Sequence, residues 1–156
     1  MKMGKKFFLR IPVIILLIVC AVVILMQSLK YSNIYDLSDE EILADYPQVH
    51  HTMLYSSSIL DNRELEASMF LMSGNCSICS LTSTQQATVE LSVDRKRGKG
   101  KLLLKNQENG EICSFPLENE DSEIAVDAGS YQVFLTGKWF GGNFTLKSDE
   151  VLFYAE

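Results

Sequence analysis

Histidine is scarce in this sequence, because the adjacent pair His50 and His51 are the only two in 156 residues. A serine hydrolase needs a histidine base beside its nucleophile, and this pair lies close to the segment that we expect to link the folded domain to a membrane. Neighbouring side chains of an extended chain point in opposite directions, so one metal site could seldom use both. We therefore expect exposed histidines, no catalytic residue, no metal site, no cofactor and no enzymatic activity.

Basic side chains are scarce outside the N-terminus. The chain has 14 lysines and arginines against 20 aspartates and glutamates, and four of the basic residues precede residue 11. Residues 30–156 therefore carry ten basic and 20 acidic side chains, a net charge of −10. Nucleic acid phosphates bind to a positive face, so nucleic acid is excluded as a partner. These 127 residues are enough for one ordinary domain with its own core.

One long apolar run is present, at Ile11–Leu29, and its 19 residues contain no charge. A helix through them is roughly 28 Å long, close to the ~30 Å hydrocarbon core of a bilayer. Positive charges precede the run and acidic residues follow it, which places the N-terminus in the cytoplasm. The sequence thus predicts a basic cytoplasmic tail (1–10), a transmembrane signal-anchor helix (11–29) and, from residue 30, a part on the outer side of the cell membrane. A cleaved signal peptide is the alternative, although the apolar run continues past the small-x-small pattern at Val19–Ala21.

The stretch from residue 30 to residue 47 is acidic, and we expect it to be a spacer between the membrane and an extracytoplasmic domain (48–156). Ser38 is followed three residues later by Glu41, which is the pattern of a capping box, and the apolar Ile42 comes next. Pro47 cannot continue a helix beyond this point. A short helix is predicted here, as part of the spacer or, alternatively, as a docking helix.

Alternating apolar and polar residues predict half-buried strands in the domain. Such alternation occurs at residues 63–72 and 88–94, and in the second stretch the polar positions predicted to face outward are Glu90, Ser92 and Asp94. Short strands at about 8 to 12 residue spacing, with turn signals between them, are typical of a β-sandwich. The predicted fold class is mainly β: a single antiparallel β-sandwich, jelly-roll-like or immunoglobulin-like, after the transmembrane helix.

The dipeptide Asn109-Gly110 is a strong hairpin signal, because both residues tolerate the positive φ of a type I′ turn. A two-residue turn at this point pairs Asn106 with Cys113 and then places Leu104 opposite the following phenylalanine. Cys113 would share a face with Leu104, and it is predicted to point into the core.

The segment "AGSYQVFLTGKWFGGNFTL", residues 128–146, contains a Gly-x-Tyr that opens one predicted strand and a Gly-x-Phe that opens the next. It resembles the closing hairpin of small β-sandwich modules found in exported bacterial proteins. The resemblance implies a membrane-anchored extracytoplasmic β-sandwich protein of a Gram-positive bacterium. It covers only this part of the chain and transfers no functional residues.

Cys76 and Cys79 form a Cys-x-x-Cys motif, and Cys113 follows 34 residues after the second of them. In an oxidising compartment, a disulfide from Cys113 to Cys79 (or to Cys76) would close a loop of roughly 35 residues and stabilise the fold by about 3 to 4 kcal/mol. Three thiols are too few for a zinc site of about four ligands. The alternative is an extracytoplasmic thiol-disulfide protein that uses Cys76 and Cys79. A thioredoxin-like motif, however, lies where a strand meets a helix, and this motif is followed by polar loop residues and another predicted strand.

Five of the seven residues from 95 to 101 are basic, namely Arg95, Lys96, Arg97, Lys99 and Lys101. We predict that they form a hairpin tip and an anion-binding loop for lipid headgroups, an anionic envelope polymer or a glycan. The alternative is a solvated turn whose charges discourage pairing with other sheet edges.

A second contact surface is predicted at Trp139 and Phe140, which precede an expected turn at Gly141-Gly142. Aromatic side chains in such a turn could contact a glycan or a membrane surface, with one of the two in the core. The sequence as a whole predicts a single-pass binding or accessory module that contacts envelope components or a membrane-protein partner.

Overall fold

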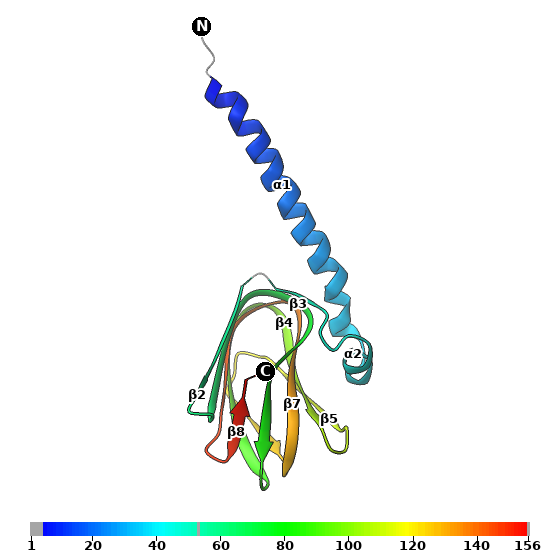
Figure 1. The fold of residues 1–156 in the computed structure, drawn as a ribbon, viewed down its shortest axis with the longest axis vertical. Helices are drawn as coiled ribbons and strands as arrows, with labels where there is room; N and C mark the ends of the chain where they lie inside the picture. Colours follow the sequence, from blue (N-terminus) through cyan, green and yellow to red (C-terminus); the bar gives the residue numbers. More distant parts are fainter. Residues whose placement is uncertain (1–4, 53, 156) are drawn as a thin grey trace.

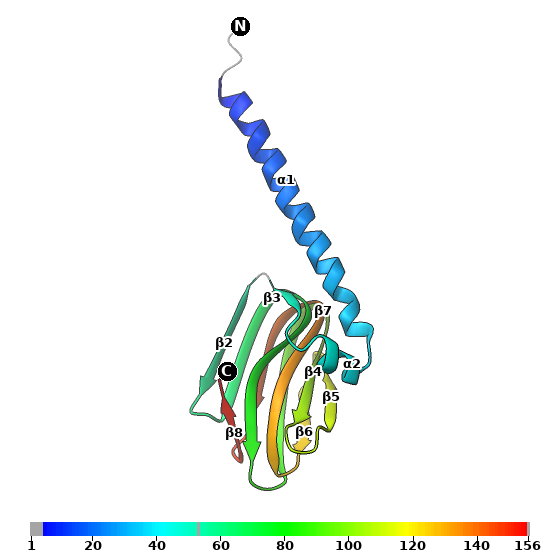
Figure 2. The ribbon, with the colours of Figure 1, turned by 45° about the vertical axis from the view of Figure 1, so that its right-hand side comes forward.

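The computed structural model describes residues 5–52 and 54–155. Three helical elements come first: α1 (Lys5–Ser32), η1 (Asn33–Asp36) and α2 (Asp39–Asp45). The strands are β1 (His50–Thr52), β2 (Tyr55–Leu60), β3 (Glu64–Ser83), β4 (Ala87–Asn106), β5 (Ile112–Pro116), β6 (Ser122–Val126), β7 (Gly129–Lys147) and β8 (Val151–Tyr154). Together they form one folded sheet from which α1 projects (Figure 1; Figure 2).

Strands β3, β4 and β7 are far longer than the sequence pattern predicts, with 20, 20 and 19 residues. Each rises in one layer, bends sharply and descends in the other, as the arch in Figure 1 shows. At this arch the pairing shifts register between Met69 and Gly74 of β3 and between Arg95 and Lys99 of β4. Such β-bulges bend and twist a strand without ending it. We call residues 69–74, 95–100 and 137–142 the bend.

The bend divides the eight-stranded sheet into the two layers of an antiparallel β-sandwich, which confirms the predicted fold class. Layer 1 contains, in order, β2, the first half of β3, the second half of β7, the first half of β4, and β6. Layer 2 contains β8, the second half of β3, the first half of β7, the second half of β4, and β5. Strand β1 pairs with β3 at the bend.

The turns predicted at residues 95–101 and at Gly141-Gly142 are wrong, because both stretches lie inside the continuous strands β4 and β7. Gly98 has a φ of 66° and Gly142 a φ of 157°, and glycine adopts positive φ at little cost. The glycines that signal a turn in the sequence form bulges here instead. For the same reason the predicted closing hairpin at residues 128–146 is one strand.

The core lies between the two layers and consists of the side chains that alternate inward along both. Phe140, Phe144 and Phe153 are its largest members, and none is more than 2% exposed. Burying one such side chain contributes about 1.5 to 3 kcal/mol relative to leaving it in water. The ring of Phe140 fills the space under the bend that a side chain on Gly100 would need.

Residues 33–46 pack on the outer face of layer 2 and are part of the domain rather than a spacer. Ile34, Ile42 and Leu43 form a second apolar cluster with Leu103 and Phe134 of the sheet. Ile42 is 0% exposed. In layer 2, apolar residues occupy both the inward and the outward positions of β4 and β7. Residues 33–46 cover the outward side chains.

A capping box and an ion pair fix α2 in this position. The Ser38 hydroxyl accepts a hydrogen bond from the backbone N–H of Glu41, and the Glu41 carboxylate accepts one from the backbone N–H of Ser38, as the sequence predicts. Lys101 Nζ lies 2.6 Å from Asp39 Oδ1, and both side chains are mostly buried. The predicted short helix before Pro47 is therefore confirmed as α2 (Asp39–Asp45), and it packs on the sheet of its own domain.

Strand β5 pairs with β4 two residues out of the predicted register, and Cys113 does not reach the core. Cys113 lies opposite Leu104. The turn is longer than two residues, because Asn106 Oδ1 accepts hydrogen bonds from the backbone N–H groups of Glu108 and Asn109. Strand β5 is the edge of layer 2, so its inward side is poorly covered and Cys113 is exposed.

Helix α1 carries its apolar side chains in the open. From Val13 to Leu29, most of its valine, isoleucine, leucine and methionine side chains are 47 to 65% exposed. By length and composition, α1 can cross a membrane. Ser28 and Ser32, near its C-terminal end, are buried against the domain, which fixes the point where the helix leaves the sandwich.

Candidate functional site

The outer face of layer 1 presents a row of charged side chains to solvent. Glu64, Lys147, Glu90 and Glu123 occupy directly opposed positions on β3, β7, β4 and β6. Their side chains lie on the outer face because their neighbours in each strand point into the core. The outward direction predicted for Glu90 from the alternation in residues 88–94 is confirmed.

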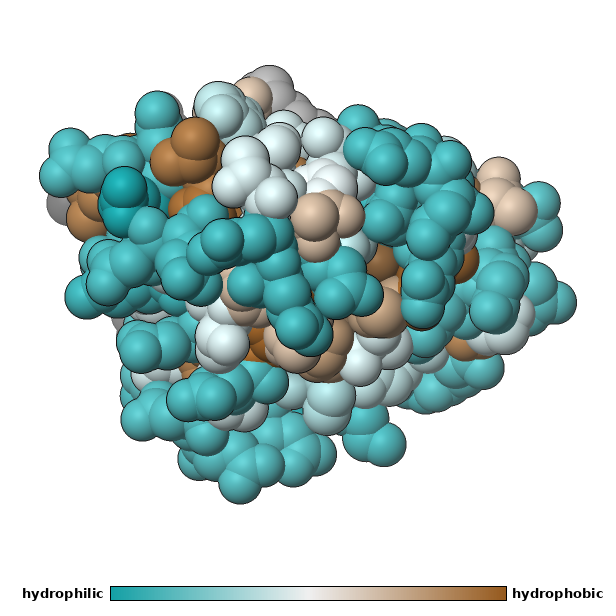
Figure 3. All heavy atoms as spheres, turned by 90° about the horizontal axis from the view of Figure 1, so that it is seen from below, coloured by the Kyte–Doolittle hydropathy of each residue, from teal (hydrophilic) through white to brown (hydrophobic). Residues whose placement is uncertain are grey.

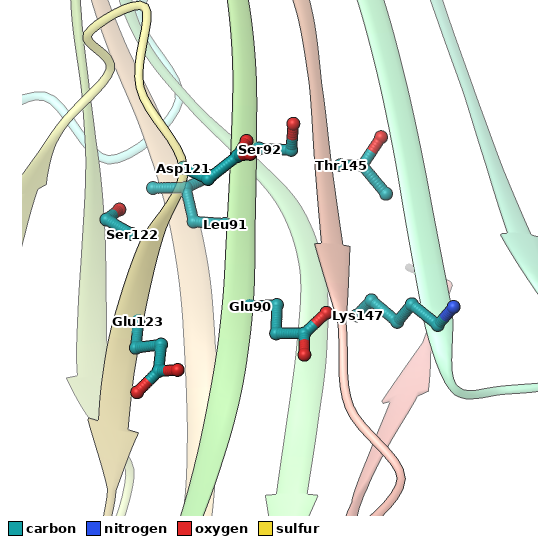
Figure 4. Close-up of a pocket in the computed structure, with 8 residues that line it drawn as sticks. All are labelled: Glu90, Leu91, Ser92, Asp121, Ser122, Glu123, Thr145 and Lys147. Carbon is teal, nitrogen blue, oxygen red and sulfur yellow. The ribbon is translucent and has the colours of Figure 1, made fainter.

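A hollow of about 410 Å³ lies on this face, over β4, β6 and β7 (Figure 4). In Figure 4 the Lys147 side chain extends away from Glu90, so its ammonium and the carboxylate stay apart. Neither group takes part in an ion pair found among residues 5–52 and 54–155. The polar lining that a ligand would meet includes Glu90, Ser92, Glu123, Thr145 and Lys147.

A second hollow, of about 360 Å³, adjoins the first over β2, β3 and β7. Thr145 lines both hollows, so they form one continuous surface across layer 1. Hydroxyl, carboxylate and amide groups dominate the second hollow as well, with Ser58, Glu66, Ser68 and Asn143 among its lining residues. We call the two hollows together the layer 1 face.

Like charges meet on the layer 1 face at a cost to stability. Glu90 and Glu123 are directly opposite each other, and like charges in this position destabilise an antiparallel pair. Sequences depart from favourable local choices mainly at functional sites. Carboxylates only accept hydrogen bonds, an ammonium only donates them, and hydroxyls do both, so this face suits a ligand with many hydroxyl groups.

The basic residues predicted to form an anion-binding loop do not converge on one point. Lys96 Nζ lies 2.7 Å from Asp94 Oδ1 in an exposed ion pair, and Lys101 is paired with α2. The Arg97 guanidinium instead lies 4.6 Å from the centre of the Phe70 ring on β3. These residues belong to the bend of β4 rather than to the predicted hairpin tip.

Trp139 and Phe140 are predicted to form a contact surface. The prediction is wrong for Phe140, whereas Trp139 remains a candidate. Phe140 is 0% exposed in the core, where no ligand reaches it. Trp139 stays partly exposed at the bend, with a φ of 59°, and its backbone N–H donates a hydrogen bond to Ser73 Oγ at 3.2 Å. The expectation that one of the pair lies in the core is confirmed.

The predicted disulfide between Cys79 (or Cys76) and Cys113 is wrong. None of the chain's cysteines, all of which lie in the described residues, forms a disulfide. Cys79 is 0% exposed inside β3, whereas Cys113 is exposed on the edge strand. The Cys-x-x-Cys motif lies in the interior of a strand, away from the helix N-terminus that stabilises a reactive thiolate. Burial, and then the negative charges of Glu111 and Asp127, raise the pKa of the Cys113 thiol.

The two histidines lie on β1 beside the bend. His50 is exposed, as predicted, but His51 is partly buried, and its Nε2 is a buried atom without a hydrogen-bond partner. Burial, and then the neighbouring His51, lower the pKa of His50. Within the described residues, no group of three or more histidine, cysteine, aspartate or glutamate side chains could hold a metal ion.

Comparisons with known proteins give a likeness in fold only. No family model matches the chain, and no curated protein matches it. A family two carbohydrate esterase from Cellvibrio japonicus is 15% identical at a TM-score of 0.37, over 69% of this chain and 34% of the esterase, so the chain spans about a third of that enzyme's length. A family 29 carbohydrate-binding module complexed with mannohexaose is 15% identical at a TM-score of 0.37, over 70% of this chain and 82% of the module. The CBM22-1 xylan-binding domain from Paenibacillus barcinonensis Xyn10C is 7% identical at a TM-score of 0.28, over 74% and 92% of the two chains.

Proposed function

We propose that this protein is a membrane-anchored binding module whose layer 1 face binds a glycan-type polymer outside the cytoplasm. The observation that carries the proposal is the exposed layer 1 face itself, where two adjoining hollows bring carboxylate, hydroxyl, amide and ammonium groups into one surface. A sugar chain presents many hydroxyls, each of which donates and accepts hydrogen bonds. It therefore matches a mixed set of donors and acceptors.

The shape and charge of the surface favour a neutral, extended polymer. Sites for small molecules are mostly enclosed and apolar, whereas these two hollows are open, have many polar lining residues and lie side by side across the strands. A hydrogen bond to a charged group contributes about 1.5 to 3 kcal/mol, so a few such contacts suffice for specific binding. The net charge of −10 on residues 30–156 disfavours polyanionic ligands.

In this proposal α1 is the membrane anchor. Its apolar side chains are exposed to about half or more, as expected for a helix whose surroundings are lipid. The basic residues 1–10 remain in the cytoplasm and the sandwich lies on the outer side of the cell membrane, in line with the charge asymmetry of the sequence. The proposed extracytoplasmic domain includes residues 33–47 because this segment packs on the sheet.

Affinity electrophoresis of the detergent-solubilised full chain tests the binding function. The gels contain a neutral polysaccharide (mannan, xylan or a soluble β-glucan), and the mobility is compared with a gel without it. E90Q removes a carboxylate from the layer 1 face, and E108Q removes one from the β4–β5 turn. We expect retardation by at least one neutral polysaccharide, unchanged for E108Q and about tenfold weaker for E90Q. Unretarded migration in all gels, or equal effects of the two variants, would overturn the proposal.

A further inference from the structure

The bend and the apolar helix lie at the same end of the domain. Figures 1 and 2 show that the long strands turn over at the end toward which α1 extends. Ser32 and Ser28 are still buried against the sandwich, while the adjacent Leu29 is 52% exposed. The apolar stretch of α1 therefore begins where the helix leaves the domain, with no linker between them. The surface of a bilayer that contains this stretch must therefore lie close to the bend.

The outer surface of the bend carries an arginine fixed on an aromatic ring. Gly141 of β7 lies between Phe70 of β3 and Arg97 of β4, and a Cβ on Gly141 would meet the Phe70 carbonyl oxygen and the Arg97 side chain at 3.0 Å or less. Because Gly141 has no side chain, Arg97 crosses β7 and places its guanidinium 4.6 Å from the centre of the Phe70 ring. The stacked guanidinium is held at the surface by the ring.

Two exposed cations of the bend are available to a ligand, whereas Arg95 in the same stretch is partly buried. Lys138 at the bend is paired with Asp36 of η1, just as Lys96 and Lys101 have carboxylate partners of their own. Arg97 and Lys99 take part in no ion pair found among the described residues, and both are exposed. On a domain with a net negative charge, these two positive groups stand out at the membrane-proximal end.

Apolar side chains accompany these cations. Leu54 is 68% exposed and Phe70 is 45% exposed, and they are neighbours because the backbone N–H of Phe70 donates a hydrogen bond to the Leu54 carbonyl oxygen. Trp139 of β7 is partly exposed in the same region. The opposite end of the domain is mostly hydrophilic (Figure 3). Aromatic, apolar and basic side chains together are typical of surfaces at the headgroup level of a bilayer.

We infer that the bend docks on anionic lipid headgroups of the same bilayer that α1 crosses. Arg97 and Lys99 bind the lipid phosphates, and Leu54 and Phe70 enter the interface between headgroups and acyl chains. The sandwich is then held against the membrane and does not move freely about the end of α1. The layer 1 face, on the side of the sandwich, stays exposed to solvent and points parallel to the membrane surface. This inference rests on the membrane anchor of the proposed function and adds a second contact to it.

The single tryptophan of the chain, Trp139, provides the test because it lies in the bend. The full chain is reconstituted into vesicles of phosphatidylcholine, with or without phosphatidylglycerol, that contain a lipid spin-labelled at its headgroup. We expect strong quenching of Trp139 fluorescence in vesicles with phosphatidylglycerol and weak quenching in pure phosphatidylcholine. High salt should abolish the difference without unfolding the protein, because it screens exposed charges. Equal, weak quenching in both vesicle types would overturn the inference.

Charge-neutral variants locate the contact. R97Q and K99Q should each lower the ratio of docked to undocked protein about fivefold in vesicles with phosphatidylglycerol, while K105Q, at the far end of β4, should behave as the wild type. An unchanged far-ultraviolet circular dichroism spectrum confirms that the variants fold. Equal quenching in R97Q, K99Q and K105Q would contradict the assignment. Flotation of the same vesicles separates the two proposals: protein that does not float lacks the anchor, and protein that floats unquenched lacks only the docking.

Discussion

Replacing Gly98 with alanine tests whether the bend is a fixed feature of the fold. Gly98 has a φ of 66°, and a Cβ at this position would lie 2.2 Å from the carbonyl oxygen of Trp139 and 2.6 Å from that of Lys138. The clashing atoms belong to the backbone of β7, so the bend itself would have to shift. A left-handed conformation costs alanine about 1 to 2 kcal/mol, and forcing packed strands apart costs a further 1 to 3 kcal/mol, roughly. G98A should therefore lower the free energy of unfolding by about 2 to 5 kcal/mol.

Gly110 provides the matched control for this substitution. Its φ is 77°, but a Cβ there would have no atom within 4 Å. G110A should therefore cost only the conformational part, about 1 to 2 kcal/mol. The free energies come from urea unfolding of the full chain in detergent, followed by far-ultraviolet circular dichroism. If the free energy of unfolding falls equally in both variants, Gly98 lies in a loose turn. The description of β4 and β7 as continuous strands packed together at the bend would then be refuted.

Three further measurements test other parts of the structure. I42A should lower the free energy of unfolding by about 2 to 4 kcal/mol and the exposed control E40A by less than about 0.5 kcal/mol; similar small losses would mean that this segment is a detached spacer. Maleimide should label Cys113 in the native protein but reach Cys79 only after unfolding, and the raised pKa of Cys113 should delay its labelling to higher pH than in the unfolded chain. Since the pKa of His50 is lowered from 6.5, the unfolded state binds this proton more tightly, so stability should fall as the pH drops through about 6.5 and H50Q should flatten that slope.

Local sequence patterns predict the structural features that depend only on residues close together in the chain. The capping box at Ser38 and Glu41 needs only a four-residue motif, and it is present. The alternation in residues 88–94 fixes which side chains face outward, and β4 follows it. The capping-box motif, with Ile42 after it, predicts α2 but not what the helix packs against. That contact depends on Leu103 and Phe134, which come from different strands.

The bend could not be predicted because turns and glycine bulges have the same local signal. Gly98 and Gly142 mark positions of positive φ, which suit either a hairpin or a strand that bends and continues. The outcome is decided by β3, β4 and β7 aligning their irregularities side by side. The predicted burial of Cys113 is wrong for another reason. Its side chain is on the predicted face, but no local pattern in the sequence indicates that β5 is an edge strand.

The layer 1 face combines residues whose proximity is a result of long-range pairing. The outward position of Glu90 was predictable from its own strand, whereas its neighbours Lys147 and Glu123 come from strands far along the chain. Neither residue belongs to a motif with a recognisable spacing. An alternating pattern identifies the exposed side of each strand, but only the sheet order shows which exposed sides form one surface.

The most direct test of the layer 1 face compares K147Q with K105Q by calorimetric titration of the full chain with a neutral polysaccharide that retards it in gels. Both variants remove one positive charge. Lys147 lies between Glu64 and Glu90 in the charged row of layer 1, whereas Lys105 lies in layer 2 opposite Ile112. The account predicts about tenfold weaker binding for K147Q, through loss of a charged hydrogen-bond donor, and wild-type binding for K105Q. Equal affinities of the two variants would contradict it.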